Sequence, residues 1–372
     1  MLAGKTVGVV GGGVAGLTFA ICAAQRGAQV EVFEQAPELA EVGAGVQISS
    51  NAARVINSLE CPDPVVGTIV DHVTIREMTS GRRLMRQKLS STDVSESDAY
   101  MLMHRADLIG WLANAACSKG VELHLGQCQD ARWHGLRGTI GDREFDHVVR
   151  ASGVKTGEKA RFSGRVAWRA LAPGGSLNET QVFIGPGRHL VAYPLRNGDL
   201  TNLVGVQDGQ TWAASGWNHP AEVADFQDAF MPHCQEVRQL LWQVSDVIRW
   251  GLFVHDDVNM LASDGPPQIG DAAQTMLPFM AQGAAMAMED AWSLAATLDG
   301  ATTLFDWAHR RSQRRRRVMQ TAEQNGRIFH EARPLVLPFH RAGMWGLGKL
   351  WPGLGTTRLR WLYDYDVVAD FP

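Results

Sequence analysis

Two glycine-rich segments that lie far apart in the chain constrain its fold more than any other feature. The first, VGVVGGGVAGLTFA, begins at Val7, and the second, IGDAAQTMLPFMAQGAAMAMEDAW, begins at Ile269. Either segment alone is a weak signal, because short glycine motifs also occur by chance. Together they predict a site that holds a long dinucleotide at both ends and leaves its reactive ring facing a separate pocket.

The first segment has the pattern of a nucleotide-binding strand, turn and helix. The apolar run 6–10 predicts a buried strand, and a helix with a buried stripe at Leu17, Ile21 and Ala24 is predicted from residue 14 to 26. The glycines between them allow a tight turn, close approach of a pyrophosphate and close packing of the helix. The helix start would point its N–H groups at the phosphates. The residues expected to contact the nucleotide here are Gly11, Gly13, Val14, Ala15 and Gly16.

An acidic residue follows the next predicted strand, residues 29–33. Glu34 lies roughly 20 residues after the glycines, where a carboxylate accepts hydrogen bonds from an adenosine ribose. It would repel a 2′-phosphate, so FAD or NAD is predicted rather than NADP. Gln35 is assigned to the same site. An ordinary tight turn between strand and helix is the alternative interpretation.

The second segment favours FAD over NAD. Gly270 permits a sharp turn, and Asp271 follows at the carboxyl end of a predicted strand, where its carboxylate can hold ribityl hydroxyls. After Pro278 a helix of small residues is predicted, whose N–H groups can approach a planar ligand and stabilise the negative charge of a reduced flavin. The residues at its start are Gly283, Ala284 and Ala285. A helix packed in the core is the alternative interpretation of these small residues.

With these residues, the chain resembles the single-component FAD-dependent aromatic hydroxylases, a family that includes p-hydroxybenzoate, salicylate and 6-hydroxynicotinate hydroxylating enzymes. The resemblance covers nearly the whole chain. It also rests on the motifs VGAGVQISSNA at 42–52, HRADL at 104–108, GRVAWRAL at 164–171, RHLVAYPL at 188–195 and WLYDYD at 361–366. It implies that the FAD contacts include Gly45, Val46, Arg105, Asp271, Gly283 and Ala284.

The resemblance also implies a reaction. We expect NAD(P)H to reduce the bound FAD, O2 to add to it, and a flavin hydroperoxide to hydroxylate a small aromatic or N-heteroaromatic substrate of the phenolic or hydroxypyridine acid type. No second Gly-x-Gly-x-x-Gly motif is present, so NAD(P)H is expected to bind transiently. A larger polyketide or quinone-like substrate, or a flavoprotein without turnover, are the alternatives.

Polar residues of one predicted strand are the candidates for handling a substrate hydroxyl. Tyr193 either faces the substrate, as the resemblance implies, or packs with its hydroxyl on a backbone group. His189 shares its strand face by period-two alternation and is either a proton relay or a satisfied core histidine. Gln47 cannot act as a base, so we expect it to orient the substrate.

Further candidates shape the substrate pocket. Pro278 and Phe279 are expected in its wall near the flavin, and Trp168 is assigned to substrate binding. Arg169 either pairs with a substrate carboxylate or is a solvated arginine between domains.

Two departures from the family pattern bear on the cofactor. Ser152-Gly153 stands where the family has Asp-Gly, and Gln274 and Thr275 stand where it has His-Pro. Both changes are expected to touch the cofactor surroundings and so to alter FAD affinity or the coupling of NAD(P)H oxidation.

The order of predicted elements indicates an α/β fold, with a Rossmann-like FAD-binding domain interwoven with a mixed, largely antiparallel β-sheet substrate domain and a helical C-terminus. The FAD-binding domain is predicted to be discontinuous. Its segments are 1–70, 101–162 and 261–300; the substrate domain comprises 71–100 and 163–260, and the helical region is 301–372.

Composition argues against several other classes. A net charge of −4 favours neither nucleic acid nor an anionic membrane as a partner. No apolar stretch is predicted to span a bilayer and no metal-ligand spacing is present. Five cysteines without a Cys-x-x-Cys pair predict reduced thiols in a cytoplasmic protein. We also expect a monomer or a homodimer. An arginine run is predicted to form a solvated or subunit-contacting helix face; its members are Arg310, Arg311, Arg314, Arg315, Arg316 and Arg317.

Overall fold

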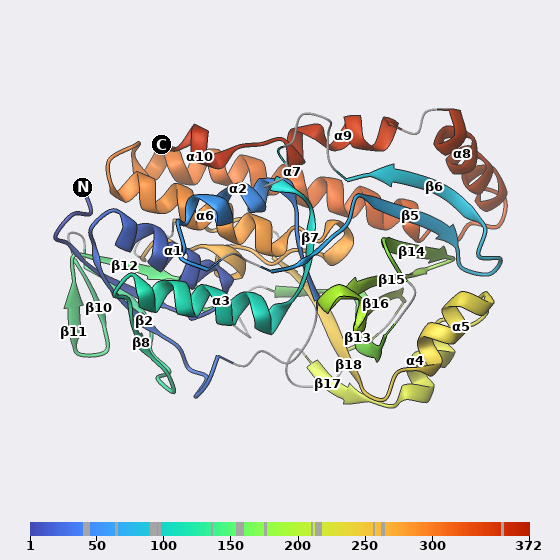
Figure 1. The fold of residues 1–372 in the computed structure, drawn as a ribbon, viewed down its shortest axis with the longest axis horizontal. Helices are drawn as coiled ribbons and strands as arrows, with labels where there is room; N and C mark the ends of the chain where they lie inside the picture. Colours follow the sequence, from blue (N-terminus) through green and yellow to red (C-terminus); the bar gives the residue numbers. More distant parts are fainter. Residues whose placement is uncertain are drawn as a thin grey trace.

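The fold is seen in a computed structural model (Figure 1). It describes residues 1–39, 45–63, 66–89, 95, 98–134, 137–153, 160–174, 177–209, 211–212, 218–255, 257–261, 265–350 and 353–372. Residues 42–44 of the VGAGVQISSNA motif lie outside the described residues.

A parallel sheet forms one end of the molecule, at the left of Figure 1. Its strand order is β12 (His147–Arg150), β1 (Thr6–Val10), β2 (Gln29–Phe33) and β8 (Glu122–His124). Strand β1 is buried from Val7 onward, as expected for a parallel strand that is covered on both faces. A small antiparallel meander packs beside it, made of β9 (Ala131–Trp133), β10 (Gly138–Ile140) and β11 (Arg143–Phe145).

An eight-stranded sheet forms the other end, at the right of Figure 1. Its order is β17 (Asn218–Ala221), β18 (Val247–His255), β13 (Ala160–Pro173), β16 (Leu200–Asp208), β15 (Arg188–Leu195), β14 (Thr180–Gly185), β5 (His72–Glu77) and β6 (Arg83–Lys88). Among the described strand pairs of this sheet, only β14 and β5 run parallel, so the predicted mixed, largely antiparallel sheet is confirmed. Helices α4 (Val223–Ala229) and α5 (Gln235–Trp242) cover its outer face.

A three-stranded sheet lies between these two parts of the fold. It has the order β3 (Gly45–Ile48), β7 (Met101–His104) and β4 (Thr68–Ile69). Strand β3 leads directly into α2 (Ser50–Ser58), and β7 leads into α3 (Arg105–Ser118). The chain therefore passes back and forth between the two large sheets, as the sequence predicts for interwoven parts.

The C-terminal region is helical, as predicted. After α6 (Gly283–Leu298) it consists of α7 (Leu304–Phe329), α8 (Leu337–Leu350), α9 (Leu354–Tyr363) and α10 (Val367–Asp370). Helix α7 packs along α6, and α8 packs on β6. Among the described helices, none combines the length and the apolar character needed to cross a lipid bilayer.

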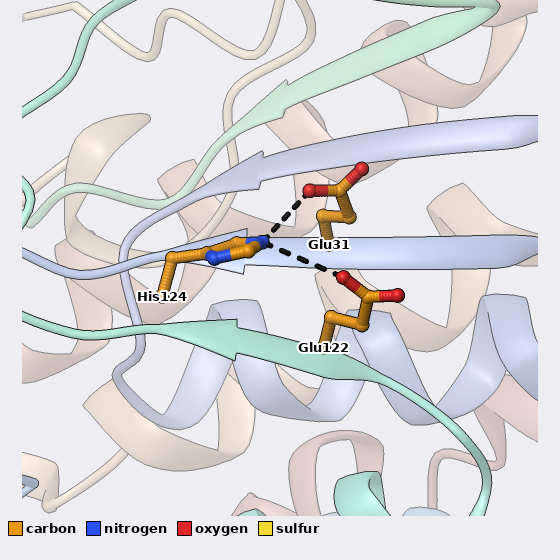
Figure 2. Close-up of side chains that lie close together, drawn as sticks. All are labelled: Glu31, Glu122 and His124. Carbon is orange, nitrogen blue, oxygen red and sulfur yellow. Dashed lines mark hydrogen bonds and ion pairs between the residues drawn. The ribbon is translucent and has the colours of Figure 1, made fainter.

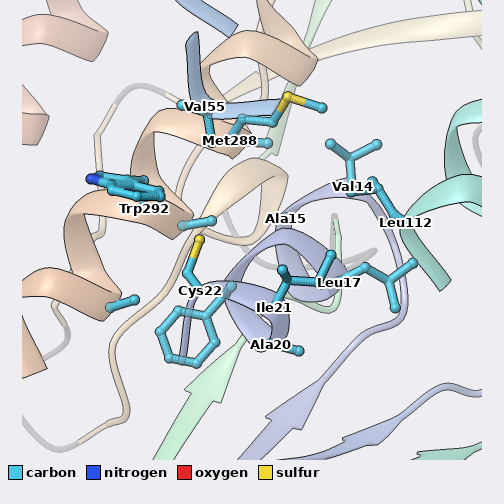
Figure 3. Packing of buried hydrophobic residues seen from close by; sticks show 14 of the residues in the cluster. Val14, Ala15, Leu17, Ala20, Ile21, Cys22, Val55, Leu112, Met288 and Trp292 are labelled. Carbon is cyan, nitrogen blue, oxygen red and sulfur yellow. The ribbon is translucent and has the colours of Figure 1, made fainter. Parts of the chain in front are cut away.

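Helix α1 (Val14–Gln25) is buried more completely than its predicted stripe suggests. Every residue from 14 to 23 is buried, whereas Ala24 of the predicted stripe is partly exposed. Figure 3 shows the cause: Met288 and Trp292 of α6 lie on one side of α1 and Leu112 of α3 lies on another. A helix that is enclosed by two others has no single apolar stripe, so helical periodicity identifies the element but not its partners.

Candidate functional site

A cavity between the parallel sheet and the large sheet brings the two glycine-rich segments together. Its lining comes from the β1–α1 turn, the end of β2, strand β3, the start of α3, the inner face of the large sheet and the stretch before α6. Most of the predicted site residues line it: Gly11, Gly13, Val14, Ala15, Glu34, Gln35, Gly45, Val46, Gln47, Arg105, His189, Tyr193, Gly270, Asp271, Pro278, Gly283 and Ala284.

The first glycine segment forms a tight turn at one end of the cavity. Gly11 has a φ of 111°, and a Cβ there would lie 2.3 Å from the backbone oxygen of Ala151. A Cβ on Gly16 would lie 1.9 Å from the oxygen of Gly11, so Gly16 supports the turn by packing and does not line the cavity. At Gly13, nothing lies within 4 Å of a Cβ position. The open space at Gly13 adjoins the start of α1, which has no side-chain cap, and it suits a pyrophosphate.

Glu34 closes the same end of the cavity. Its carboxylate accepts the backbone N–H of Gly12 at 2.6 Å and that of Ala36 at 2.9 Å. These two bonds fix a negative charge at the carboxyl end of β2, where a ribose would be held and a further phosphate repelled. Gln35 is exposed next to it on the cavity lining.

Asp271 lies in the short turn η3 (Gly270–Ala272) and faces the cavity. The residue is exposed, and its open surface belongs to the cavity lining. Burial raises the pKa of Asp271, although the charges of Arg315 and Arg105 act to lower it. A carboxylate in this position needs hydrogen-bond donors, and the hydroxyls of a ribityl chain would supply them.

A buried ion pair holds the Asp271 turn in place. Asp290 of α6 accepts the backbone N–H of Gly270 at 3.2 Å and two bonds from Arg315, at 2.9 Å from Nε and 2.6 Å from Nη2. Arg315 also donates to the carbonyl oxygen of Gly270 at 2.9 Å and to that of Gln274 at 3.1 Å. The pair therefore grips both polar groups of the Gly270 backbone from behind the cavity.

The prediction of a solvated or subunit-contacting arginine face is therefore wrong for part of the run. Arg311 and Arg315 are each 1% exposed, because residues four apart share the face of α7 that packs on α6. Glu289, next to Asp290, binds Arg311 and Arg314 at 2.7 Å each. Burial alone acts to raise the pKa of Glu289, but these two arginines lower it to about 2. We call Glu289, Asp290, Arg311, Arg314 and Arg315 the ion cluster.

The start of α6 faces the cavity with its backbone. Gly283 and Ala284 line the cavity, and nothing lies within 4 Å of a Cβ position on Gly283. The side chain of Gln282 does not cap the helix; it donates to Ser49 Oγ at 3.0 Å instead. Ala285 is fully buried and does not line the cavity, which corrects its prediction as a contact residue. The helix start is open toward a planar anion.

Tyr193 lies at the far end of the cavity, on the inner face of the large sheet. Its ring fills the space beside Gly45, where a Cβ would lie 2.5 Å from the tyrosine hydroxyl. Gln47 forms a hydrogen bond with this hydroxyl, and Gln47 Oε1 accepts the hydroxyl of Tyr100 at 2.7 Å. Burial raises the pKa of Tyr193 far above that of a free tyrosine, against Arg169 and Gln47. Tyr193 therefore stays protonated and can orient a ligand but cannot act as a base at neutral pH.

His189 and Arg169 share this inner face. In the sheet register His189 lies opposite Val206, and Arg169 lies opposite Val204, and all four line the cavity or its edge. Arg169 is half-buried and lies over the ring of Trp250, 4.7 Å from its centroid. Arg169 therefore lies at the seam between the two sheets with its side chain on the cavity lining, a position that fits both interpretations.

Two predicted pocket residues lie elsewhere. Trp168 faces the outer side of β13, where its ring stacks on Phe226 of α4 with centroids 5.8 Å apart. It cannot contact a ligand in the cavity, because successive side chains on a strand point to opposite faces. Phe279 packs behind the lining against the ring of His189, with centroids 5.4 Å apart. Only Pro278 of the predicted wall lines the cavity.

The departures from the family pattern have different positions. Ser152 and Gly153 line the cavity, as expected, and the buried Ser152 Oγ has no hydrogen-bond partner among the described residues. Gln274 and Thr275 are buried outside the lining, which corrects the expectation that they touch the cofactor surroundings. Thr275 Oγ1 lies 3.0 Å from His255 Nδ1 and serves the local packing.

Sequence reasoning missed two residues of the site. Asn202 of β16 accepts the backbone N–H of Gly45 at 2.8 Å and so ties β3 to the large sheet. Gln282 joins Ser49 and Asn51 behind the start of α6. Gln282 lies within the second glycine-rich segment, directly before Gly283. Period-two alternation in the strand TNLVGVQ places Asn202 on the same face as Val204 and Val206.

Among the described residues, Glu31, Glu122 and His124 form the group that could offer ligands to a metal ion (Figure 2). They lie on β2 and β8, away from the cavity lining. Glu31 Oε2 already binds His124 Nε2 at 2.7 Å and also pairs with Arg143. The guanidinium occupies the place of a cation, so the group reads as an ion-pair network.

Comparison with known proteins agrees with this site. The NAD(P)-binding Rossmann-like domain family matches residues 9–47. The chain is 33% identical to 3-amino-4-hydroxybenzoate 2-monooxygenase of Streptomyces cremeus, over 90% of this chain and 87% of that protein. It is 29% identical to 3-hydroxybenzoate 6-hydroxylase of Polaromonas naphthalenivorans, over 96% of both. Its fold is similar to that of a salicylate hydroxylase in a substrate complex, with a TM-score of 0.79 and 21% identity over 98% of this chain and 97% of that one.

Proposed function

This chain belongs to the FAD-dependent aromatic hydroxylases, and from that premise we propose that it uses NAD(P)H and O2 to hydroxylate a small aromatic or N-heteroaromatic acid with a ring hydroxyl. The two relatives compared above are named as an aminohydroxybenzoate monooxygenase and a hydroxybenzoate hydroxylase. The substrate proposed here is of the same chemical class.

The residues around the cavity fit FAD as the cofactor. The open space at Gly13 would take the pyrophosphate, Glu34 the adenosine ribose and Asp271 the ribityl hydroxyls. Arg105 lines the cavity as well, and the start of α6 would face the isoalloxazine edge. When bound, FAD supplies the oxygen-activating redox chemistry; the chain's own residues bind, orient and exclude water.

One observation carries the substrate assignment. Beyond the start of α6, the inner face of the large sheet presents one cation and two hydrogen-bonding rings to the same space, from Arg169, Tyr193 and His189. A guanidinium is suited to a carboxylate, and a protonated tyrosine with a neutral histidine is suited to a phenol. The pocket thus has partners for both polar groups of a hydroxylated aromatic acid.

The apolar residues around these groups keep the reaction dry. Val191 and Val204 of the sheet and Met276 and Leu277 before α6 line the cavity between the polar groups. Excluding water protects an activated oxygen from unproductive release as peroxide.

The cysteines are free thiols at all five positions, which supports our expectation of a reducing compartment such as the cytoplasm.

The decisive experiment is a substrate screen that follows three signals together. Purified holoprotein is mixed with NADH or NADPH and with hydroxybenzoates, aminohydroxybenzoates or hydroxypyridine carboxylates, while flavin absorbance, peroxide and hydroxylated product are measured. We expect one class of acids to stimulate NAD(P)H oxidation, with one oxygen atom from 18O2 in the product.

Matched phenols that lack the carboxylate serve as controls, and we expect weaker stimulation from them. Stimulation by large polycyclic phenols alone would replace the proposed substrate class with the polyketide or quinone-like one. Bound flavin that NAD(P)H does not reduce with any compound would show a flavoprotein without turnover.

A further inference from the structure

The ring of His189 has a second histidine behind it. His189 Nδ1 lies 2.6 Å from Nε2 of His330, the residue that ends α7. Both rings are buried; His189 is 2% exposed as a residue and the His330 side chain is also 2% exposed. A close pair of buried imidazoles is stable only when one nitrogen donates to the other, so the two rings share one proton.

The second histidine, His330, contacts a carboxylate that is partly exposed to solvent. His330 Nδ1 lies 2.8 Å from Asp208 Oδ1, and the Asp208 side chain is 33% exposed. The two atoms lie within hydrogen-bond distance but outside hydrogen-bond geometry, so the contact between His330 and Asp208 is an ion-pair contact in this structure. Bonds of this kind commonly tighten only when ligand is bound.

The groups around His189, His330 and Asp208 are otherwise apolar or positively charged. Phe279 and Phe329 cover the His189 ring, with centroids 5.4 and 5.5 Å away. Among the described residues, Arg165 of β13 also contacts this series of side chains: its Nε donates to Asp208 at 2.8 Å. Protons on the two rings therefore have two ends to move between: the cavity and Asp208.

We propose that His189, His330 and Asp208 form a proton relay that carries the proton of a substrate hydroxyl from the far end of the cavity, where Tyr193 lies, to solvent. The proposal rests on the proposed function, because it assumes a ligand with an ionisable ring hydroxyl. The ligand gives its hydroxyl proton to His189 Nε2, and the Nδ1 proton of His189 passes to His330 Nε2. The Nδ1 proton of His330 passes to Asp208 and then to water. One proton leaves the ligand, one enters solvent, and neither ring is left charged.

The electrostatics explain why a relay is needed. Burial lowers the pKa of His189 well below that of a free histidine, and His330 and Arg165 lower it further. His189 is therefore neutral and can accept a proton, but it cannot keep one. At the other end, burial acts to raise the pKa of Asp208, but His330 and Arg165 outweigh burial and lower it. Asp208 is thus an ionised carboxylate that passes a proton on to water.

The test measures proton release on ligand binding and needs no turnover. Holoprotein is mixed rapidly, in weak buffer, with a nitro-substituted hydroxybenzoate, which absorbs visible light only as the phenolate. The pH is set below the pKa of the free ligand. Phenolate absorbance reports loss of the proton from the ligand, and an indicator dye reports its arrival in solvent. In the wild-type protein we expect both signals to rise together.

His330→Gln breaks the relay while keeping a polar side chain. We expect proton release to slow by tenfold or more, with flavin content and ligand Kd within twofold of wild type. Asp208→Asn, at the exposed end, is expected to slow release by a smaller factor. His309→Gln, an exposed histidine on the same helix, is the control and should release protons at the wild-type rate.

A high-pH arm separates a relay from a structural role. Above the pKa of the free ligand, the ligand arrives already ionised, so His330→Gln and wild type should bind it at equal rates. A structural defect would persist at both pH values. If His330→Gln loses its flavin, Asp208→Asn decides the question by the same two arms.

Two results would overturn the relay: wild-type protein that binds the ligand without releasing a proton, or relay variants that release it at the wild-type rate. Failure of the proposed function looks different. In that case the wild type releases the proton on binding but hydroxylates none of the acids in the screen.

Discussion

At the nucleotide end of the cavity the lining is made of backbone, glycines and helix starts, whereas at the substrate end it is made of side chains on one face of a sheet. Gly13 and Gly283 leave room for a ligand, while Tyr193, Arg169 and His189 reach toward one. The first end is set by local turn geometry and is suited to one fixed cofactor. The second end is set by which side chains happen to face inward, so it can change with single substitutions.

The nucleotide end depends on the ion cluster behind it, and breaking the cluster should have the largest effect. Asp290→Ala leaves Arg311 and Arg315 buried without this carboxylate. We expect a loss of about 3–5 kcal/mol in the free energy of unfolding, measured with denaturant. Arg316→Ala, at an exposed position of α7, is the control and should stay within about 0.5 kcal/mol of wild type. A loss below about 1 kcal/mol in Asp290→Ala would show that the cluster does not support this end.

The same cluster predicts an acid sensitivity. The pKa of Glu289 is lowered from 4.5 to about 2 in the folded protein, so its stabilisation is fully present above pH 4.5. It should be lost as the pH falls from 4.5 toward 2. Glu289→Gln lacks this titration, so the difference in unfolding free energy between it and wild type should shrink over that range. A difference that is constant with pH would contradict the assignment.

Two glycines of one turn have different roles: Gly13 borders the space for the ligand, whereas Gly16 packs against the backbone. Gly13→Ala places a methyl group in open space, so we expect normal thermal stability of the apoprotein but FAD affinity lower by about tenfold or more, roughly 1.4 kcal/mol. Gly16→Ala meets the Gly11 backbone, so both stability and FAD affinity should fall. Flavin fluorescence titration and thermal unfolding measure the two effects. Equal behaviour of the two variants would remove the distinction.

At the substrate end, Tyr193→Phe removes a hydroxyl without emptying the space beside Gly45. We expect hydroxylation to fall by about tenfold, the value of one neutral hydrogen bond, with FAD binding intact. Product formation per NAD(P)H consumed is the measurement. Unchanged product formation would remove Tyr193 from the residues that orient the substrate.

Two neighbouring residues of β13, Arg169 and Trp168, test which face of the large sheet lines the cavity. Their substitution is expected to have the smallest effects. Arg169→Met should raise KM for a hydroxybenzoate but leave a phenol without a carboxylate unaffected. Trp168→Phe, one residue earlier on the outer face, should leave both KM values unchanged and lower stability by about 1 kcal/mol. A change in KM for Trp168→Phe alone would mean that the faces are assigned the wrong way round.

The contrast between the two ends also explains what the sequence could predict. The glycine spacing, Glu34 and Asp271 are local patterns, because each is placed by the strand, turn or helix that carries it. The prediction that Trp168 lines the pocket is wrong, because alternation separates Trp168 from Arg169 but does not say which face of the sheet is the inner one. That choice depends on the register between β13, β16 and β15.

The sequence also does not predict the contacts between elements that lie far apart in the chain. The arginine run looks like a solvated face until α6 is placed beside it with Glu289 and Asp290. His330 lies 141 residues from His189, and no spacing rule connects them. Burial of charge needs a partner, and partners at this distance are found only in the folded chain.

Helix α7 contacts both ends of the cavity. Along its length Arg315 holds the Gly270 turn, and at its end His330 meets His189. The C-terminal helices are therefore an integral part of the fold. A protein shortened before Leu304 would lose both the arginine that supports the cofactor side of the cavity and the histidine behind the substrate side.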